Sequence, residues 1–445
     1  MIYQIRKNLI KLLQSKIFIP FFVFHTLRKI YLLEKVLLEK DEYPIVILIL
    51  NYKRWEKDVD LINKDPRVKV LILPESLQSL FGRIFYAPLI GKIKNGEWWR
   101  SEYKAQLTKI HQKYTDYLES FLFILRLFIR FDVISSCSFY YLQDQSWQEV
   151  CNKINDLHFI CMHKENQKDD AILDKMVNEY KRKGIKYKGN KIFVYNRKEK
   201  ECLIRGGVCS PNQITITGCI RMDNLIEKSF SYEYKVKNNA ITLFSFRHAF
   251  GGMRFKNDDD GGFSLTRKNG CVELFENVHG YIAQFAIENP SIPVYIKIKW
   301  DAKWYGYVEN AIKKKTGKLV NQIPNLYVGS DIDPQKLIDI SRIIIGINST
   351  ALLESRILGK EVLIPLFDEL ELKYYNNVYF RKYFDKEFNL IREKNKFLEN
   401  VTFLYGKTFN LRPVGYEIVE EFLGYYDSKS KERVISEILK TIDKK

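Results

Sequence analysis

The sequence predicts an α/β protein with two Rossmann-like domains facing across a cleft, followed by C-terminal helices. Short apolar runs recur along the chain, they are continuous rather than alternating, and amphipathic segments lie between most of them. Continuous apolar runs are typical of strands covered on both faces, as in parallel sheets. Alternation of strand and helix with right-handed crossovers builds a doubly wound sheet. A chain of 445 residues is long enough for two such domains.

The first half contains the N-terminal domain, which we expect to cover 41–225. Its helices are predicted at "EKDVDLINK", "SWQEVCNKIND" and "AILDKMVNEYKRKG". Its strands are predicted at "PIVILIL" (44–50), "VKVLILP" (68–74), "FDVISSC" (131–137), "LHFICMH" (157–163), "KIFVYN" (191–196) and "QITITG" (213–218). Residues 1–40 precede it as a basic amphipathic segment.

The second half repeats the pattern after a polar linker at 226–239. We expect a C-terminal Rossmann-like domain over 240–410 and further helices over 411–445, where "GYEIVEEFLGYY" and "KERVISEILKTIDKK" have helical periodicity. Helices are also predicted at "VELFENVHGYIAQFAIEN", "PQKLIDIS" and "ALLESRILG". The strands are predicted at "AITLFSF" (240–246), "VYIKIK" (294–299), "LYVG" (326–329), "IIIGIN" (343–348) and "EVLIPL" (361–366).

The composition narrows the class of partner. Lysine and arginine outnumber the acids 72 to 54, which gives a net charge of +18. That excess suits a nucleic acid, a membrane surface or a polyanionic small molecule. Nucleic acid is not expected as a partner, because the basic residues are dispersed and no nucleic-acid-binding module is recognisable. The seven cysteines form no C-x-x-C pair, so a cytoplasmic location fits better than a disulfide framework or a zinc site.

Two apolar runs have to be considered as possible membrane-spanning segments. The runs at 17–24 and 121–134 are too short or too interrupted by charge to span a bilayer. The first 40 residues are expected either to lie on the anionic inner surface of the cytoplasmic membrane or to pack as a helix on the protein's own core.

Ligands of doubly wound sheets bind at the carboxyl ends of the strands, so polar residues there are the site candidates. Asn348, Ser349 and Thr350 come where a strand ends and a helix begins, a place that favours an anion. The alternative is that Asn348 or Ser349 only caps the helix. Glu354, one turn later, is a candidate for ribose hydroxyls. The strand "YIKIK" adds two cations, Lys297 and Lys299.

A second candidate follows the first strand of the C-terminal domain. The turn "RHAFGGMRF" contains Arg247, His248 and Gly251, and a glycine-rich basic turn suits a phosphate. Such turns are also common in ordinary loops. The acidic run "KNDDDGG" (256–262) resembles clusters that hold a divalent cation, but adjacent loop acids are usually solvated, and no metal is predicted.

Acid–base candidates lie at strand ends of the N-terminal domain. They are Glu165, Asp144 and His163, one of which would act on an acceptor hydroxyl; the alternative for each is an ordinary surface charge. No G-x-G-x-x-G or Walker A motif is present, which disfavours dinucleotide and P-loop chemistry.

The segment "TITGCIRMD" leads toward the linker. Its residues Thr217, Gly218, Arg221 and Asp223 are candidates for a hinge or cleft role, with a structural ion pair between Arg221 and Asp223 as the alternative.

Four of these motifs together resemble a known family. "ICMHKEN", "ITITGCIRMD", "YIKIK" and "IIIGINSTALLESRILGKEVLIP" occur in the order seen in bacterial surface-carbohydrate and capsule polysaccharide biosynthesis proteins. That family looks like GT-B glycosyltransferases, and its C-terminal half is related to Kdo transferases and CDP-glycerol glycerophosphotransferases. The resemblance covers roughly 130–370. Where the family strand continues from lysine into His-Pro, this chain has Trp300 and Asp301.

The resemblance implies a glycosyltransferase that uses a CMP-, UDP- or CDP-linked sugar to extend a glycan or lipid-linked acceptor of a capsule, lipopolysaccharide or related polymer. It places the donor nucleotide at Asn348, Ser349, Thr350 and Glu354, and it implies neither metal nor cofactor. Three alternatives remain open: a UDP-sugar 2-epimerase, a CDP-glycerol-type glycerophosphotransferase, and a non-catalytic nucleotide-binding subunit of a polysaccharide assembly complex.

Overall fold

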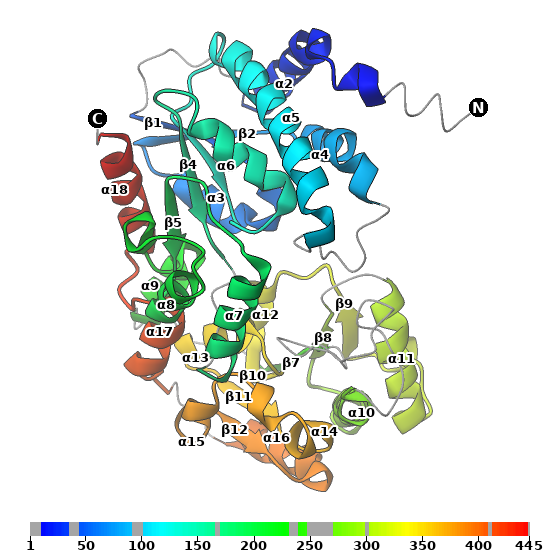
Figure 1. The fold of residues 1–445 in the computed structure, drawn as a ribbon. Helices are drawn as coiled ribbons and strands as arrows, with labels where there is room; N and C mark the ends of the chain where they lie inside the picture. The colour runs from blue at the N-terminus through cyan, green and yellow to red at the C-terminus, as the bar shows by residue number, and fades with distance from the viewer. Residues whose placement is uncertain are drawn as a thin grey trace, which may run out of the picture. The chain divides into compact units, whose positions relative to one another are not determined.

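The chain folds into two compact units. The structure, a computed structural model, describes residues 10–34, 44–90, 101–164, 170–230, 239–246, 270–298, 302–407 and 412–443 (Figure 1). Unit 1 contains 1–166, 173–223 and 422–445, and unit 2 contains 167–172 and 224–421. Each unit is built around one parallel sheet of six strands, and this confirms the predicted α/β class with two Rossmann-like domains.

The sheet of unit 1 has the strand order β2-β1-β3-β4-β5-β6. Its strands are β1 (Ile45–Ile49), β2 (Val68–Ile72), β3 (Val133–Ser136), β4 (His158–Met162), β5 (Lys191–Val194) and β6 (Ile214–Ile216). Its helices are α2 (Ile19–Glu34), α3 (Glu56–Ile62), α4 (Glu75–Ile90), α5 (Ser101–Arg126), α6 (Gln145–Cys151), α7 (Asp170–Lys183), α8 (Arg197–Arg205) and α18 (Ser430–Ile442). The division between the units falls within three helices: α7, whose first three residues are assigned to unit 2, α9 (Asp223–Phe230) and α17 (Tyr416–Leu423).

The two faces of this sheet bury two separate hydrophobic cores. Val46, Leu48 and Leu50 point into one core, which α2 and α4 to α8 complete. Ile45, Ile47 and Ile49 point the other way. That second core is closed by α3 and by α18, more than 200 residues further along the chain. The fully buried pattern of β1 follows from cover on both faces, as a continuous apolar run predicts.

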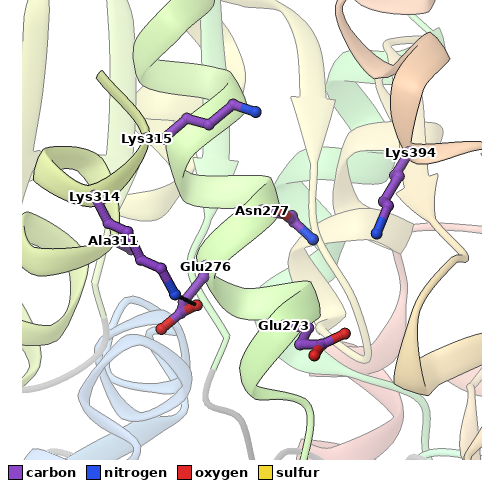
Figure 2. Close-up of a pocket in the computed structure, with 7 residues that line it drawn as sticks. All are labelled: Glu273, Glu276, Asn277, Ala311, Lys314, Lys315 and Lys394. Atoms are coloured by element: carbon purple, nitrogen blue, oxygen red, sulfur yellow. Dashed lines mark hydrogen bonds and ion pairs between the residues drawn. The ribbon is translucent and has the colours of Figure 1, made fainter. Parts of the chain in front are cut away.

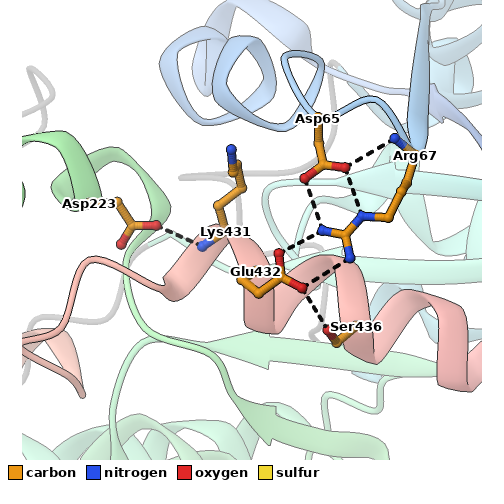
Figure 3. A network of polar contacts seen from close by, with 6 residues as sticks. All are labelled: Asp65, Arg67, Asp223, Lys431, Glu432 and Ser436. Atoms are coloured by element: carbon orange, nitrogen blue, oxygen red, sulfur yellow. Dashed lines mark hydrogen bonds and ion pairs between the residues drawn. The ribbon is translucent and has the colours of Figure 1, made fainter.

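Polar contacts fix α18 in this position. Arg67 pairs with Asp65 at 2.9 Å and with Glu432 of α18 at 2.6 Å. Asp223 accepts hydrogen bonds from the backbone N–H groups of Ser430, at 3.1 Å, and of Lys431, at 2.7 Å. Figure 3 shows the contact with Lys431. A carboxylate at the first backbone N–H groups of a helix satisfies donors that have no partner within the helix.

The sheet of unit 2 has the order β12-β11-β10-β7-β8-β9. Its strands are β7 (Ala240–Phe244), β8 (Val294–Lys297), β9 (Leu326–Gly329), β10 (Ser341–Ile345), β11 (Glu361–Pro365) and β12 (Asn389–Ile391). Its helices are α10 (Val272–Glu288), α11 (Ala302–Thr316), α12 (Pro334–Ile340), α13 (Thr350–Ile357), α14 (Glu369–Leu372), α15 (Phe384–Glu387) and α16 (Phe397–Gly406). Read from β9, this order is 3-2-1-4-5-6, the arrangement of dinucleotide-binding Rossmann domains.

All eleven predicted strands form, and β12 is a strand that the sequence did not predict. Part of the predicted linker is helical, because α9 extends to Phe230; residues 231–238 lie outside the described residues. In each sheet the strand order reverses at one point, between β1 and β3 in unit 1 and between β7 and β10 in unit 2. Ligands of open α/β sheets bind at the carboxyl ends of the strands that flank such a reversal.

Candidate functional site

In unit 2, the reversal point brings together the residues after β7 and those after β10. Leu243 pairs with Ile345 in parallel register, and a Cβ built on Gly346 would lie 3.3 Å from the carbonyl oxygen of Phe244. The turn 346–349 therefore passes directly over the end of β7, and a side chain at Gly346 would crowd it.

The start of α13 is built by two side chains. Ser349 is the N-cap, and its hydroxyl accepts a hydrogen bond from the backbone N–H of Ala351 at 3.3 Å. Asn348 has a positive φ of 49°. Its amide nitrogen donates to the carbonyl of Asn377 at 3.0 Å, and its amide oxygen accepts from the N–H of Tyr379 at 2.8 Å. The Asn348 side chain thus links the turn to the segment 377–379. The helix begins with Ser349 as its N-cap and the half-buried Thr350 as its first residue.

The rest of the motif is largely internal. Glu354 is 7% exposed on α13, and Gly359, at φ +69°, follows the helix in the conformation expected of a C-terminal glycine. Arg356 is buried and donates to the carbonyl of Lys360 at 2.9 Å and to Glu387 at 3.2 Å. The buried Lys360 ammonium donates to the carbonyl of Asp339, and burial lowers the pKa of Lys360 to about 8. The charged residues at the end of this motif therefore stabilise unit 2.

A hydrogen-bonded relay follows β7, and the sequence did not suggest it. Trp304 Nε1 donates to Ser245 Oγ at 2.9 Å, and Ser245 Oγ lies 2.8 Å from His279 Nε2. His279 Nδ1 lies 2.7 Å from the carbonyl of Phe275, which can only accept, so Nδ1 carries the proton and Ser245 donates to Nε2. Burial lowers the pKa of His279 to about 4, so the ring is neutral at physiological pH. The relay holds the end of β7 to α10 and α11.

The two helices that follow the reversal-point strands differ at their first turns. At α10, the buried carboxylate of Glu369 accepts from the N–H groups of Glu273 and Leu274, at 2.8 and 2.9 Å. An anion at this helix start would meet a protein carboxylate. At α13 the cap is the neutral hydroxyl of Ser349. The start of α13 is therefore the better anion site of the two.

A pocket of about 310 Å³ lies beside α10 and α11, with Lys394 on its rim (Figure 2). Its lining includes Glu276 and Lys314, which form an ion pair, and Glu273. Its lining comes from α10, from α11 and from Lys394, and none of it comes from the start of α13, so this pocket lies apart from the candidate anion site.

The other residues predicted to bind the donor lie either away from the reversal point or outside the described residues. The Lys297 ammonium donates to the carbonyls of Ser330 at 2.6 Å and Ile298 at 3.3 Å, and burial lowers its pKa. It is held at the end of β8, one strand away from the reversal point. Arg247, His248, Gly251 and Lys299 lie outside the described residues, as does the acidic run 256–262.

In unit 1, the reversal point contains a buried polar cluster of Asn51, Ser136 and Asp144. Asn51 follows β1, with a positive φ of 56°, and Ser136 ends β3. The Asp144 carboxylate accepts from Ser136 Oγ at 2.5 Å and from Asn51 Nδ2 at 3.0 Å. Asp144 is 1% exposed, and burial raises its pKa to about 6. Sequence reasoning found Asp144 but missed Asn51 and Ser136, although both stand where an apolar run meets polar residues.

Basic and aromatic side chains lie next to this cluster. Exposed Arg54 donates to the hydroxyl of Tyr141 at 2.7 Å, and its guanidinium lies 4.5 Å from the centre of that ring. Lys164 donates to the carbonyl of Arg54. His163 is 4% exposed, with Nε2 3.5 Å from the buried carboxylate of Glu199. Asp144 and His163 are thus both internal, while Glu165 lies outside the described residues.

The segment 217–223 contacts α18, the C-terminal helix of the same unit. The Thr217 carbonyl accepts from Arg433 at 2.9 Å, and a Cβ on Gly218, at φ +86°, would lie 2.4 Å from Ser430 Oγ. The backbone N–H of Arg221 donates to Asp58 at 3.1 Å, and Asp223 caps α18 as described above. These contacts give the segment a structural role in attaching α18.

Two features are absent from the part of the chain that the structure describes. No group of three or more His, Cys, Asp and Glu side chains there could hold a metal ion. No helix within those same ranges is both long and apolar enough to cross a membrane.

Comparison with known proteins shows similarity in fold alone. No family model and no curated protein sequence matches the chain. A crystal structure described as a UDP-N-acetylglucosamine 2-epimerase of Listeria monocytogenes aligns with TM-score 0.51 and 11% identity, over 91% of this chain and 98% of that one. Another UDP-N-acetylglucosamine 2-epimerase aligns with TM-score 0.50 and 12% identity, over 89% and 95%. The chain therefore has a GT-B-like two-domain α/β fold.

Proposed function

We propose that the protein is a glycosyltransferase that moves a sugar from a nucleotide-sugar donor to a growing cell-surface polysaccharide, in the cytoplasm at the inner face of the membrane. The observation that supports it most is the start of α13. It lies at the strand-order reversal of a Rossmann-type sheet and has a neutral Ser349 cap, whereas Glu369 already occupies the start of α10. A helix start of this kind stabilises the negative charge that develops on a departing nucleotide phosphate.

In this proposal the donor phosphates rest on the first turn of α13, and no metal is required. Glu165, which closely follows a buried strand in the sequence, is the residue that takes the proton from the acceptor hydroxyl in this proposal. Asp144 and His163 are less suited to that step, because both are buried and Asp144 already accepts two hydrogen bonds. We assign Asp144 instead to holding the turn at Asn51 in shape.

Two substitutions of one residue test the nucleotide site. Ser349→Asp and Ser349→Asn both retain a good N-cap, so both should keep the stability of α13. Asp adds a negative charge where the phosphate would lie. We expect Ser349→Asp to weaken binding of the cognate nucleotide at least about tenfold in calorimetry, while Ser349→Asn weakens it far less. Equal binding by the Asp variant and the native protein would remove α13 from the site.

The reaction itself is tested by incubating the protein with UDP-, CMP- and CDP-linked sugars and CDP-glycerol in the presence of glycan acceptors. Release of nucleotide with elongation from a nucleotide sugar supports the proposal, and release from CDP-glycerol alone indicates a glycerophosphotransferase. Isomerisation of the sugar without release indicates an epimerase. Binding without turnover would point to a non-catalytic subunit.

A further inference from the structure

An exposed apolar surface on unit 1 combines two segments that are about 100 residues apart in the sequence. The first is α2 with the residues 12–18 before it, and the second is the end of α5 with the two residues that follow. We call the set the apolar–basic surface; its apolar members are Leu12, Ile17, Phe21, Phe24, Phe123, Leu127 and Phe128, each between 52% and 76% exposed. These are seven of the fourteen large exposed apolar side chains among the described residues, so apolar exposure is concentrated here.

Helix α2 is apolar on two sides. Ile19, Phe22 and Val23 are buried in the core of unit 1, whereas Phe21 and Phe24 point outward at 62% and 66% exposure. A helix that only packs on its own core needs one apolar face. The second face therefore exceeds what folding requires, and a patch of this kind marks an interaction site.

The two segments belong to one packed structure. Phe22 of α2 contacts Phe81 with ring centres 5.4 Å apart, and Phe81 contacts Phe121 of α5 at 5.3 Å. Figure 1 shows α2 beside α5 in unit 1, and the two helices are in contact. The apolar run at 121–134, which is too interrupted to span a bilayer, thereby adds its exposed side chains to the same helical layer as the N-terminal segment.

The charged side chains of the chain up to residue 33, one residue before the end of α2, are all basic. Lys11, Lys16, Arg28 and Lys29 are exposed, and the sequence from 1 to 33 contains no aspartate or glutamate. Apolar side chains flanked by cations fit the boundary between acyl chains and anionic headgroups. A second copy of the chain fits poorly, because a two-fold interface would bring the same cations together.

We propose that the apolar–basic surface docks unit 1 on an anionic lipid bilayer, with Phe21, Phe24 and Phe128 entering the headgroup region and the lysines contacting lipid phosphates. This deepens the membrane part of the proposed function by naming the surface and the lipid class. It does not depend on the nucleotide chemistry, because its residues belong to unit 1 and α13 belongs to unit 2.

The test is co-sedimentation of the full chain with phosphatidylcholine vesicles and with equimolar phosphatidylcholine–phosphatidylglycerol vesicles. We expect binding to the anionic vesicles that falls as salt is raised, and much weaker binding to the neutral ones. Phe21→Ser with Phe24→Ser, and separately Phe123→Ser with Phe128→Ser, should each reduce the partition coefficient at least about tenfold. Lys11→Gln with Lys16→Gln should reduce it about tenfold on anionic vesicles only.

Phe403→Ser is the matched control, because Phe403 is 60% exposed but lies on α16 of unit 2. It should bind vesicles like the native chain. Thermal unfolding and nucleotide binding, measured on every variant, separate failure of docking from loss of fold or of the nucleotide site. The proposal is overturned if the aromatic double variants bind as well as the native chain. It is also overturned if light scattering shows a dimer that the Phe21/Phe24 variant dissociates and no vesicle binding is seen.

Discussion

At the scale of single residues, the two strand-order reversals are occupied by buried polar groups with internal partners. Asp144 holds Ser136 and Asn51 in unit 1, and His279 holds Ser245 in unit 2. Groups of this kind are costly to bury without hydrogen bonds and rigid when they are satisfied. They therefore determine the shape of the loops at the reversal points, and burial raises the pKa of Asp144.

Asp144→Asn should change how stability depends on pH. The folded-state pKa of Asp144 is about 6, above its ordinary value of 3.8, so the folded protein holds a proton that the unfolded chain releases between these pH values. The stabilisation of the folded protein that comes from this bound proton is fully present below pH about 4 and is lost as the pH rises through about 6. Across this interval the free energy of unfolding should fall by at most about 3 kcal/mol. Asparagine removes this titration.

The measurement is denaturant unfolding of the native chain and of the variant at several pH values from 4 to 7. The stability of the native chain relative to Asp144→Asn should fall across this interval. Asp174→Asn, at a side chain that is 73% exposed and pairs with Arg205, is measured in parallel to show the effect of removing a surface carboxylate. A constant difference between the native chain and Asp144→Asn would contradict the assigned burial effect.

At the scale of elements, α18 shows which contacts hold a helix in place. Its apolar residues Val434, Ile435 and Ile438 are buried in the second core of unit 1, while Glu432 makes an exposed ion pair with Arg67. Burial of an isoleucine side chain is worth several times an exposed ion pair. The packing of α18 should therefore dominate over the network in Figure 3.

Two substitutions on α18 compare these effects. Ile435→Ala should lower the free energy of unfolding by about 2–5 kcal/mol, because it leaves a cavity at a fully buried position. Glu432→Gln should cost less than about 1 kcal/mol. Urea unfolding of both variants measures the two values. A larger loss for Glu432→Gln than for Ile435→Ala would show that the polar network, rather than the core, attaches this helix.

Strands and site residues differed in how well the sequence predicted them. The eleven predicted strands are continuous apolar runs, and cover on both faces of a parallel sheet produces that pattern directly. Strand β12 was missed because Asn389–Ile391 offers only two consecutive apolar residues, which stand between a polar asparagine and Arg392. Asp144 was found from its place near a strand end. Its partners Asn51 and Ser136 lie 93 and 8 positions away, and only the pairing of β1 with β3 brings all three together.

At the scale of the whole molecule, the connectivity makes unit 1 discontinuous. Its sheet is formed by residues before 223, but one of its faces is covered by α18 from beyond 422. Unit 2 lies between these segments in the sequence and has its own sheet and core. Removal of the C-terminal segment should thus destabilise unit 1, although most of unit 1 lies far from that segment in the sequence.

A chain truncated after Glu421 should show this. Without α18, the face formed by Ile45, Ile47 and Ile49 is exposed to water, so unit 1 should lose cooperative unfolding while unit 2 keeps its protection. Hydrogen exchange followed by mass spectrometry measures the two sheets separately. We expect fast exchange in β1 to β6 and near-native exchange in β7 to β11. Native protection in β1 would show that α3 alone covers that face.

The late position of α18 also bears on how the protein is synthesised. Every strand of both sheets is synthesised before residue 430. One apolar face of the first sheet therefore lacks the cover of α18, and has only that of α3, while most of the second unit is translated. Chaperones that shield apolar segments would be needed most during that interval. A premature stop codon anywhere upstream of α18 would release a polypeptide whose earliest-made half stays incomplete, and cellular proteases would recognise it as such.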